Sequence, residues 1–295
     1  MKSGFISVVG RTNAGKSTLV NALIGEKIAI ISNKPQTTRY RIMGIRSEED
    51  SQIIFTDTPG IHKPKTRLGD FMINEATEAL NDTDAALLVI EPIDNVGISE
   101  KKLIETLKKL DIPAILVINK IDTIKKENLF PIIEKYSEEF DFDAIIPVSA
   151  KTGDGVSVLL DEIKKYLIEG PMFFPEDMVT DSPIKQRLSE IVREKLLWSL
   201  DKEIPHGIAI EVTKMDEGKF KTALDITIYC EKQSHKGIII GKGGELLKTV
   251  GTRARYDMEK LLDKKVALNL WVKVKEGWRD STMLLKNFGF QGENR

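Results

Sequence analysis

A glycine-rich turn near the start of the sequence has the residue types and spacing that could hold phosphate. It satisfies the pattern G-x-x-x-x-G-K-S/T, in which backbone N–H groups surround phosphate oxygens, the lysine reaches the β- and γ-phosphates and the hydroxyl binds Mg²⁺. The turn separates an apolar run, 5–9, from an amphipathic stretch, 16–24, which is the strand–loop–helix context that the motif requires. An ordinary packing turn is the alternative. We predict nucleotide contacts from Gly10, Asn13, Ala14, Gly15, Lys16, Ser17 and Thr18.

Two further stretches could sense the γ-phosphate. The sequence DTPG follows an apolar run, so that Asp57 can reach Mg²⁺ through water and the Gly60 N–H can contact the γ-phosphate. Upstream, PQTTRY at 35–40 offers Thr38, or alternatively Thr37, as a further Mg²⁺ ligand. Because these contacts are lost on hydrolysis, both stretches are predicted switch loops, and we call 35–40 the first switch. For 35–40, a polar surface turn is the alternative. The predicted catalytic residues are Lys16, Thr38, Asp57 and Gly60, and the predicted Mg²⁺ ligands are Ser17, Thr38 and Asp57.

Two more motifs, NKID and SAK, indicate which base is bound. A carboxylate at Asp122 can accept hydrogen bonds from the guanine ring N–H and the exocyclic amine, a donor pair that adenine lacks. The Lys120 stem would cover one face of the ring, and the Ala150 N–H would reach guanine O6. Each short motif is weak by itself, but this order, with each motif after an apolar run, predicts a guanine nucleotide. The candidate base-reading residues are Asn119, Lys120, Asp122, Ser149, Ala150 and Lys151.

The elements that must position these motifs alternate along the first half of the chain. Continuous apolar runs predict strands at 5–9, 51–57, 84–90, 113–119 and 143–149. Helical periodicity predicts helices at 16–24, 71–80, 99–110, 129–140 and 155–167. This alternation is typical of an α/β fold, here a doubly wound P-loop domain with its functional loops at the carboxyl ends of the strands.

The amino-acid composition limits which classes of protein the sequence can belong to. The chain has 295 residues, 41% hydrophobic and 30% charged, which is typical of a soluble globular protein with room for two domains. Its single cysteine, Cys230, excludes an internal disulfide and favours a reducing compartment, so we expect a cytoplasmic protein. The sequence shows no cleavable signal pattern and no apolar stretch near the roughly 20 residues that cross a bilayer.

Charge divides the chain into two halves. Residues 1–182 hold 22 Lys and Arg against 29 Asp and Glu, a net charge of −7, whereas 183–295 hold 22 against 16, a net charge of +6. The proline- and acid-rich stretch between the halves predicts three parts: a nucleotide-binding domain at 1–168, a linker at 169–182 and a second domain at 183–295. The basic half indicates a polyanionic partner.

The second half is predicted to be a smaller α+β domain. A helix at 183–200 is followed by alternating runs that predict strands, and the sequence IIGKGGEL joins two helical segments. Its G-x-x-G pattern allows a nucleic-acid backbone to approach closely, with basic residues nearby; a glycine-rich junction that serves packing alone is the alternative. This half resembles a KH domain of the helix-first, type II form. The candidate RNA contacts are His235, Lys236, Gly237, Ile240, Gly241, Lys242, Gly243, Gly244, Lys248 and Arg253.

The five nucleotide motifs resemble those of GTPases related to translation factors. Asn13 together with TTR in the first switch resembles members that use K⁺, with Asn13 as its candidate ligand. Ile61 stands where Ras-like proteins carry a glutamine that orients water, so the resemblance implies slow hydrolysis and acceleration by a partner. His62 is either a base or, as we favour, a solvated residue of the switch loop.

The order of the two domains extends the resemblance to the Era family over nearly the whole chain. The stretches that carry it are FPEDMVTD, IIIGKGGE and LWVKVKEGW. The resemblance implies a GTPase that binds the 3′ region of small-subunit ribosomal RNA, assists maturation of the 30S-type subunit and associates peripherally with the cytoplasmic face of the membrane. We expect the protein to be a monomer. GTP is expected to order both switches and thereby to change the availability of the RNA groove.

Two other classes of function stay open at this level. One is a regulatory GTPase whose basic half binds a protein or an anionic membrane. The other is an enzyme that modifies RNA and uses GTP as a gate; the second half offers no cluster of cysteine, histidine or carboxylate residues suited to that chemistry.

Overall fold

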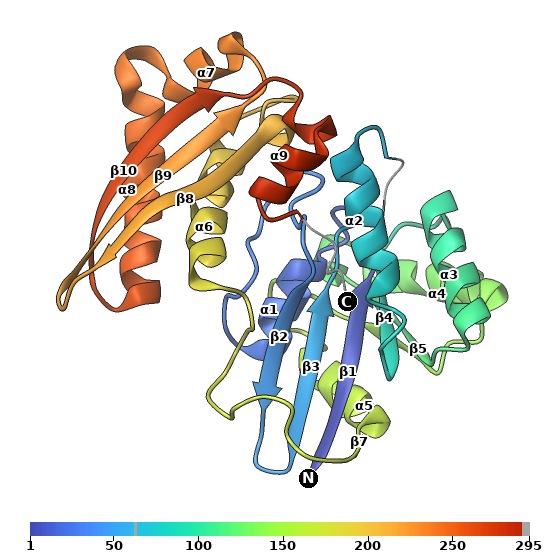
Figure 1. Cartoon of the computed structure of the whole chain (residues 1–295). Helices are drawn as coiled ribbons and strands as arrows, with labels where there is room; N and C mark the ends of the chain where they lie inside the picture. The colour runs from blue at the N-terminus through green and yellow to red at the C-terminus, as the bar shows by residue number, and fades with distance from the viewer. Residues whose placement is uncertain (62–63, 291–295) are drawn as a thin grey trace. The chain divides into compact units, whose positions relative to one another are not determined.

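The computed structural model describes residues 1–61 and 64–290, which divide into two compact units (Figure 1). Of the described residues, the first unit holds Met1–Ile31, Pro35–Pro64 and Met72–Asp181. The second unit holds Ser32–Lys34, Lys65–Phe71 and the chain from Ser182 on. No helix among the described residues is both long and apolar enough to cross a membrane.

The first unit is built on a mixed, mostly parallel sheet in the order β2-β3-β1-β4-β5-β6. Strand β2 runs antiparallel to β3, and the short β7 runs antiparallel to β1. The doubly wound arrangement is confirmed, whereas β2 was not predicted from the sequence. The strands are β1 (Lys2–Val9), β2 (Ile42–Ser47), β3 (Ser51–Asp57), β4 (Ala85–Ile90), β5 (Ala114–Ile118), β6 (Ala144–Pro147) and β7 (Ile168–Glu169).

Helices cover both faces of this sheet. Apolar side chains of α1 and α5 pack into one core, and those of α3 and α4 into the core on the opposite face. Every residue of β4 is buried, because a central parallel strand is covered on both sides. The helices of this half of the chain are α1 (Lys16–Ile24), α2 (Arg67–Glu78), α3 (Ile98–Leu110), α4 (Leu129–Glu139) and α5 (Val156–Ile163).

The predicted linker follows the edge of the first unit. The centroid of the Phe173 ring lies 4.9 Å from that of the Phe5 ring. Gln52, fully buried on β3, accepts hydrogen bonds from the Phe173 and Phe174 N–H groups at 2.9 and 3.0 Å. Further on, the Ile45 N–H of β2 donates to the Val179 carbonyl at 2.9 Å. The linker is therefore fastened to β2 and β3.

The second unit has the element order α-β-β-α-α-β, which is the helix-first order predicted for a type II KH domain. Its sheet has the order β10-β9-β8, with β9 parallel to β10 and antiparallel to β8. Alternate residues of β9, among them Leu224, Ile226 and Cys230, face a core shared with the helices. The elements are α6 (Ile184–Ser199), β8 (Ile208–Glu217), β9 (Lys221–Cys230), α7 (Gln233–Ile240), α8 (Glu245–Leu262), β10 (Lys265–Val274) and α9 (Thr282–Asn287).

Candidate functional site

The glycine-rich turn joins the end of β1 to the start of α1. Steric crowding at Gly15 leaves no room for a side chain. Gly15 has φ 91°, and a Cβ atom placed on it would lie 2.3 Å from the Asn119 side chain. Any larger residue would separate the turn from the base-reading loop. Asn13 also has a positive φ, 68°, which is uncommon for a residue with a side chain.

The three predicted Mg²⁺ ligands come together from three separate parts of the chain. The Ser17 Oγ lies 2.7 Å from the Thr38 Oγ1 and donates to the Asp57 Oδ2 at 2.7 Å. The Thr38 hydroxyl also donates to that carboxylate oxygen at 3.2 Å. The buried Asp57 Oδ1 has no hydrogen-bond partner among the described residues. Two hydroxyls and a buried carboxylate with an unused oxygen fit the hard oxygen ligands that Mg²⁺ prefers.

Lys16 is buried beside this cluster. Its ammonium donates to the Gly10 carbonyl at 3.1 Å and the Arg11 carbonyl at 2.9 Å. Burial lowers the pKa of Lys16 to about 8, and the nearby charge of Asp57 opposes this shift. Burial likewise raises the pKa of Asp57, against the Lys16 charge and the hydroxyl hydrogen bonds. The buried Lys16 ammonium thus lies against the turn that is expected to hold phosphate.

The DTPG loop touches the glycine-rich turn directly. A Cβ atom on Gly60 would lie 2.7 Å from the backbone N and Cα of Thr12, so only glycine allows this approach. The Ile61 N–H donates to the Gly10 carbonyl at 3.3 Å, and its side chain has no polar group to orient water. His62 lies outside the described residues.

Asn119 ties the base-reading loops to the glycine-rich turn. Its side-chain amide donates to the Ala14 carbonyl at 2.9 Å and accepts from the Ala150 N–H at 3.0 Å. The Ser149 hydroxyl donates to the Asp122 carboxylate at 2.7 Å and so orients it. Of the remaining predicted contacts, Thr18 follows Ser17 in α1, and Lys151 is exposed.

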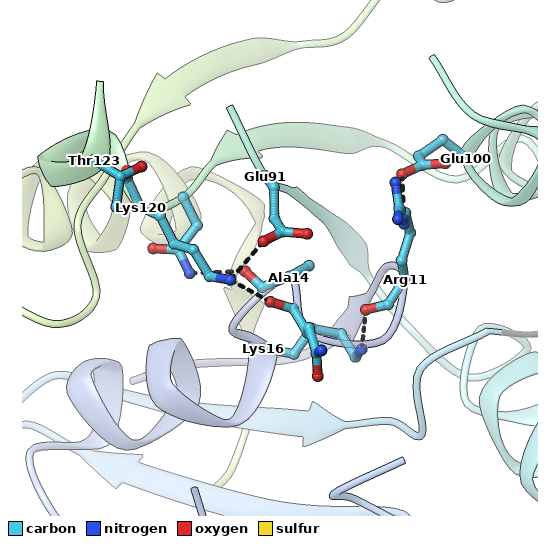
Figure 2. Close-up of polar contacts among 9 residues, drawn as sticks. Arg11, Ala14, Lys16, Glu91, Glu100, Lys120 and Thr123 are labelled. Atoms are coloured by element: carbon cyan, nitrogen blue, oxygen red, sulfur yellow. Dashed lines mark hydrogen bonds and ion pairs between the residues drawn. The ribbon is translucent and has the colours of Figure 1, made fainter. Parts of the chain in front are cut away.

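Two acidic residues of the site were missed by the sequence analysis (Figure 2). Glu91 forms an ion pair with Lys120 at 2.6 Å. Glu100, 3% exposed on α3, forms an ion pair with Arg11 of the glycine-rich turn at 3.5 Å. Glu91 directly follows β4, and this position at the end of a strand is the signal that could have identified it. For Glu100, no local motif marks the long-range contact.

The predicted RNA-binding loop joins α7 to α8. Gly243 and Gly244 have φ of 59° and 82°, and a Cβ on either would meet no atom within 4 Å. The backbone here is therefore open to a close partner. Lys242 is exposed at the tip. A Cβ on Gly241, in contrast, would lie 2.7 Å from the Leu246 Cβ, so this glycine allows the start of α8 to pack.

The other predicted RNA contacts lie on the two flanking helices. Helix α7 carries His235 and Lys236, both partly buried, the exposed Gly237 and the partly buried Ile240. Helix α8 carries Lys248 and Arg253, both exposed.

Two protein families match separate parts of the sequence. The family described as 50S ribosome-binding GTPase matches residues 5–120. The family described as KH domain matches residues 203–279. The first match covers three of the nucleotide motifs and the first two residues of NKID. The second match covers the glycine loop with both flanking helices.

Whole-chain relatives carry both parts. GTPase Era of Ruminiclostridium cellulolyticum is 50% identical over 291 residues, which are 98% of each chain. An Aquifex aeolicus Era variant bound to GDP and aluminium fluoride has a TM-score of 0.95 and 38% identity, covering 99% of this chain and 100% of that one. A structure of Era with MgGDPNP and nucleotides 1506–1542 of 16S ribosomal RNA has a TM-score of 0.96, with the same identity and coverage. This chain belongs to the Era family of GTPases.

Proposed function

We propose that this GTPase binds the 3′ region of small-subunit ribosomal RNA through its KH domain, in a manner set by the bound nucleotide, and assists maturation of the small ribosomal subunit. The observation that carries the proposal is similarity over 99% of the chain to an Era structure containing MgGDPNP and a 16S ribosomal RNA fragment. The glycine loop of the second unit supplies the open backbone that such a partner needs.

In the hydrolysis of GTP to GDP and phosphate, the site residues of the first unit have different roles. Ser17, Thr38 and Asp57 would hold Mg²⁺, which when bound neutralises charge on the phosphate oxygens. Lys16 places a second positive charge at the transferred phosphoryl group, and the Gly60 N–H donates to it. Water attacks in line, and the apolar side chain of Ile61 cannot orient this water. Intrinsic turnover is therefore slow, and a partner accelerates hydrolysis.

Base selection follows from the ordered loops around Asn119. The Asp122 carboxylate, oriented by Ser149, accepts from guanine. The Ala150 N–H, which in the structure donates to the Asn119 side chain, turns to guanine O6 when the base is bound. Asn13, next to the phosphates in the turn, is the candidate ligand of K⁺ as an additional ion.

Nucleotide state is communicated to the RNA site through the switches. The first predicted switch is followed directly by β2. The Ile45 N–H of β2 donates to the Val179 carbonyl of the linker, and the linker continues into α6. The protein works as a cytoplasmic monomer on the 30S-type subunit, with peripheral contact to the membrane.

The test is binding of a labelled single-stranded RNA that carries the 3′ end of small-subunit ribosomal RNA. The double variant Lys242→Asp/Gly243→Asp should lose RNA affinity and keep GTP affinity, because negative side chains at the loop repel phosphate. A matched control is Lys219→Asp, in the exposed turn at the opposite end of β9 from α7. RNA binding that survives the double variant, or is absent from the unaltered protein, would contradict the proposal.

A further inference from the structure

Glu91 occupies the first position after β4, at the edge of the sheet where the nucleotide motifs gather. Its carboxylate accepts from the Lys120 ammonium at 2.6 Å, and the same ammonium donates to the Asn13 carbonyl at 2.6 Å (Figure 2). One lysine therefore connects the base-reading loop, the glycine-rich turn and the end of β4. Glu91 supplies the negative charge that pairs with this lysine.

The two backbone positions joined by Lys120 both have unusual conformations. Lys120 has φ 61° and Asn13 has φ 68°, in the left-handed region that residues with side chains rarely adopt. Such conformations persist only where surrounding contacts determine them. Here, the Thr123 hydroxyl donates to the Lys120 carbonyl at 2.7 Å, and the ammonium fixes the Asn13 carbonyl.

The end of the Lys120 stem lies close to the turn. A Cβ on Gly15 would lie 3.8 Å from the Lys120 Cε, so the end of the stem runs beside this glycine. An ammonium without a carboxylate partner would be free to turn toward water, since its attraction to a carbonyl alone is weaker than to a full charge. The Glu91 carboxylate thus limits where the stem can lie.

An ion pair elsewhere in the same loop shows what an ordinary surface contact looks like. Asp94 pairs with Lys135 at 2.8 Å, and both side chains are about half exposed. Glu91 is less exposed, at 24%, and its lysine is also bonded to the glycine-rich turn. Exposed ion pairs contribute little to stability. What distinguishes Glu91 from Asp94 is therefore the contact that its lysine makes with the glycine-rich turn.

We propose that Glu91 is a positioning residue for guanine nucleotides: it holds the Lys120 ammonium on the Asn13 carbonyl, so that the stem stays across the base pocket and the turn stays shaped for phosphate. The inference rests on the nucleotide site proposed above. Because the contact lies at the base and the turn, and not at the γ-phosphate, it slows release of GDP and GTP alike.

The test measures dissociation of fluorescent GDP and of a fluorescent GTP analogue from the full chain with Mg²⁺. Glu91→Gln should release both about tenfold faster, which corresponds to ~1.4 kcal/mol, with an unchanged melting temperature. Lys120→Met, which keeps most of the stem and removes the ammonium, should also speed release. The double variant should match Lys120→Met alone, because Glu91 acts through that ammonium. Asp94→Asn is the matched control and should release nucleotide at the unaltered rate.

Each contrary result has a distinct meaning. If Lys120→Met speeds release and Glu91→Gln stays within about twofold of the unaltered protein, Glu91 is not a positioning residue. Additive effects in the double variant would show that Glu91 acts independently of Lys120, which also overturns the inference. Failure of the unaltered protein to bind guanine nucleotides would instead overturn the proposed site itself.

Discussion

Lys16 and Asp57 are oppositely charged residues that are buried near each other. The charged form of each is unfavourable there in the absence of phosphate and metal. Burial lowers the pKa of the lysine and raises the pKa of the carboxyl, and their mutual attraction offsets only part of both shifts. The nucleotide would bring negative charge to Lys16, and Mg²⁺ would bring positive charge to Asp57. The binding free energy therefore includes relief of a cost already present in the empty protein.

The pKa of Lys16, about 8, predicts a pH dependence of nucleotide affinity. Below pH 8 the ammonium is already charged and binding takes up no proton at this residue. Above pH 8 the empty site loses the proton, which phosphate binding must restore, so affinity falls as pH rises. By pH 9 the affinity for GDP should be about tenfold lower than at pH 7.

Calorimetry at pH 9 in two buffers of different ionisation enthalpy checks this directly. The dependence of the binding enthalpy on the buffer should show uptake of nearly one proton per GDP bound. Lys16→Arg, whose guanidinium stays charged throughout this range, should remove that uptake. An unaltered protein that binds GDP without proton uptake at pH 9 would contradict the buried, partly deprotonated lysine.

At the scale of the elements, the linker gives a specific prediction, because the buried Gln52 side chain makes three hydrogen bonds to its backbone. Besides accepting from Phe173 and Phe174, Gln52 donates to the Phe174 carbonyl at 2.9 Å. Gln52→Leu should leave these backbone groups unpaired, at a cost of about 1–3 kcal/mol for each buried group. The linker should then detach from β3 locally.

Hydrogen exchange followed by mass spectrometry measures this detachment. The segment containing Phe173 and Phe174 should exchange at least about tenfold faster in Gln52→Leu, while β5 should keep its protection. Thr180→Val is a comparison at another point of the linker, since it removes the hydrogen bond that the Thr180 hydroxyl donates to the Met43 carbonyl at 2.6 Å. Unchanged exchange in Gln52→Leu would show that the linker is held by other contacts.

The elements differ in how far the sequence could predict them. Strands such as β4 are continuous apolar runs because both faces are covered, and the motifs follow their ends, so local sequence sufficed. Strand β2 is an edge strand that directly follows the first predicted switch and forms a hairpin with β3. Its sequence, IMGIRS, includes glycine, arginine and serine, so no continuous apolar run marked it as a strand. Helix α2 begins at Arg67, four residues before the predicted start.

In the site, short local motifs identified some residues, whereas contacts across the fold account for the residues that were missed. Ser17, Thr38 and Asp57 each belong to a recognisable short motif, and the fold brings their oxygens together. Glu91 and Glu100 belong to no motif, because their importance comes from the lysine and arginine that they contact across the fold. Residues that act through another side chain are hard to find without a structure.

For the whole molecule, the two halves differ in charge and in the partner that each suits. The first half has a net charge of −7 but concentrates buried positive charge at the turn, whereas the second half has a net charge of +6 and an open glycine loop. The linker is fastened to β2, the strand that directly follows the first predicted switch. This is the route along which the proposed function requires a change in the switch to reach α6.

The central claim, that nucleotide state controls RNA binding, is tested most directly by one comparison. The affinity of the full chain for the 3′-end ribosomal RNA is measured with Mg²⁺ and either a non-hydrolysable GTP analogue or GDP. We predict tighter RNA binding with the GTP analogue, by about 5-fold or more, the usual range for coupled sites. Equal RNA affinities in the two nucleotide states would contradict the account.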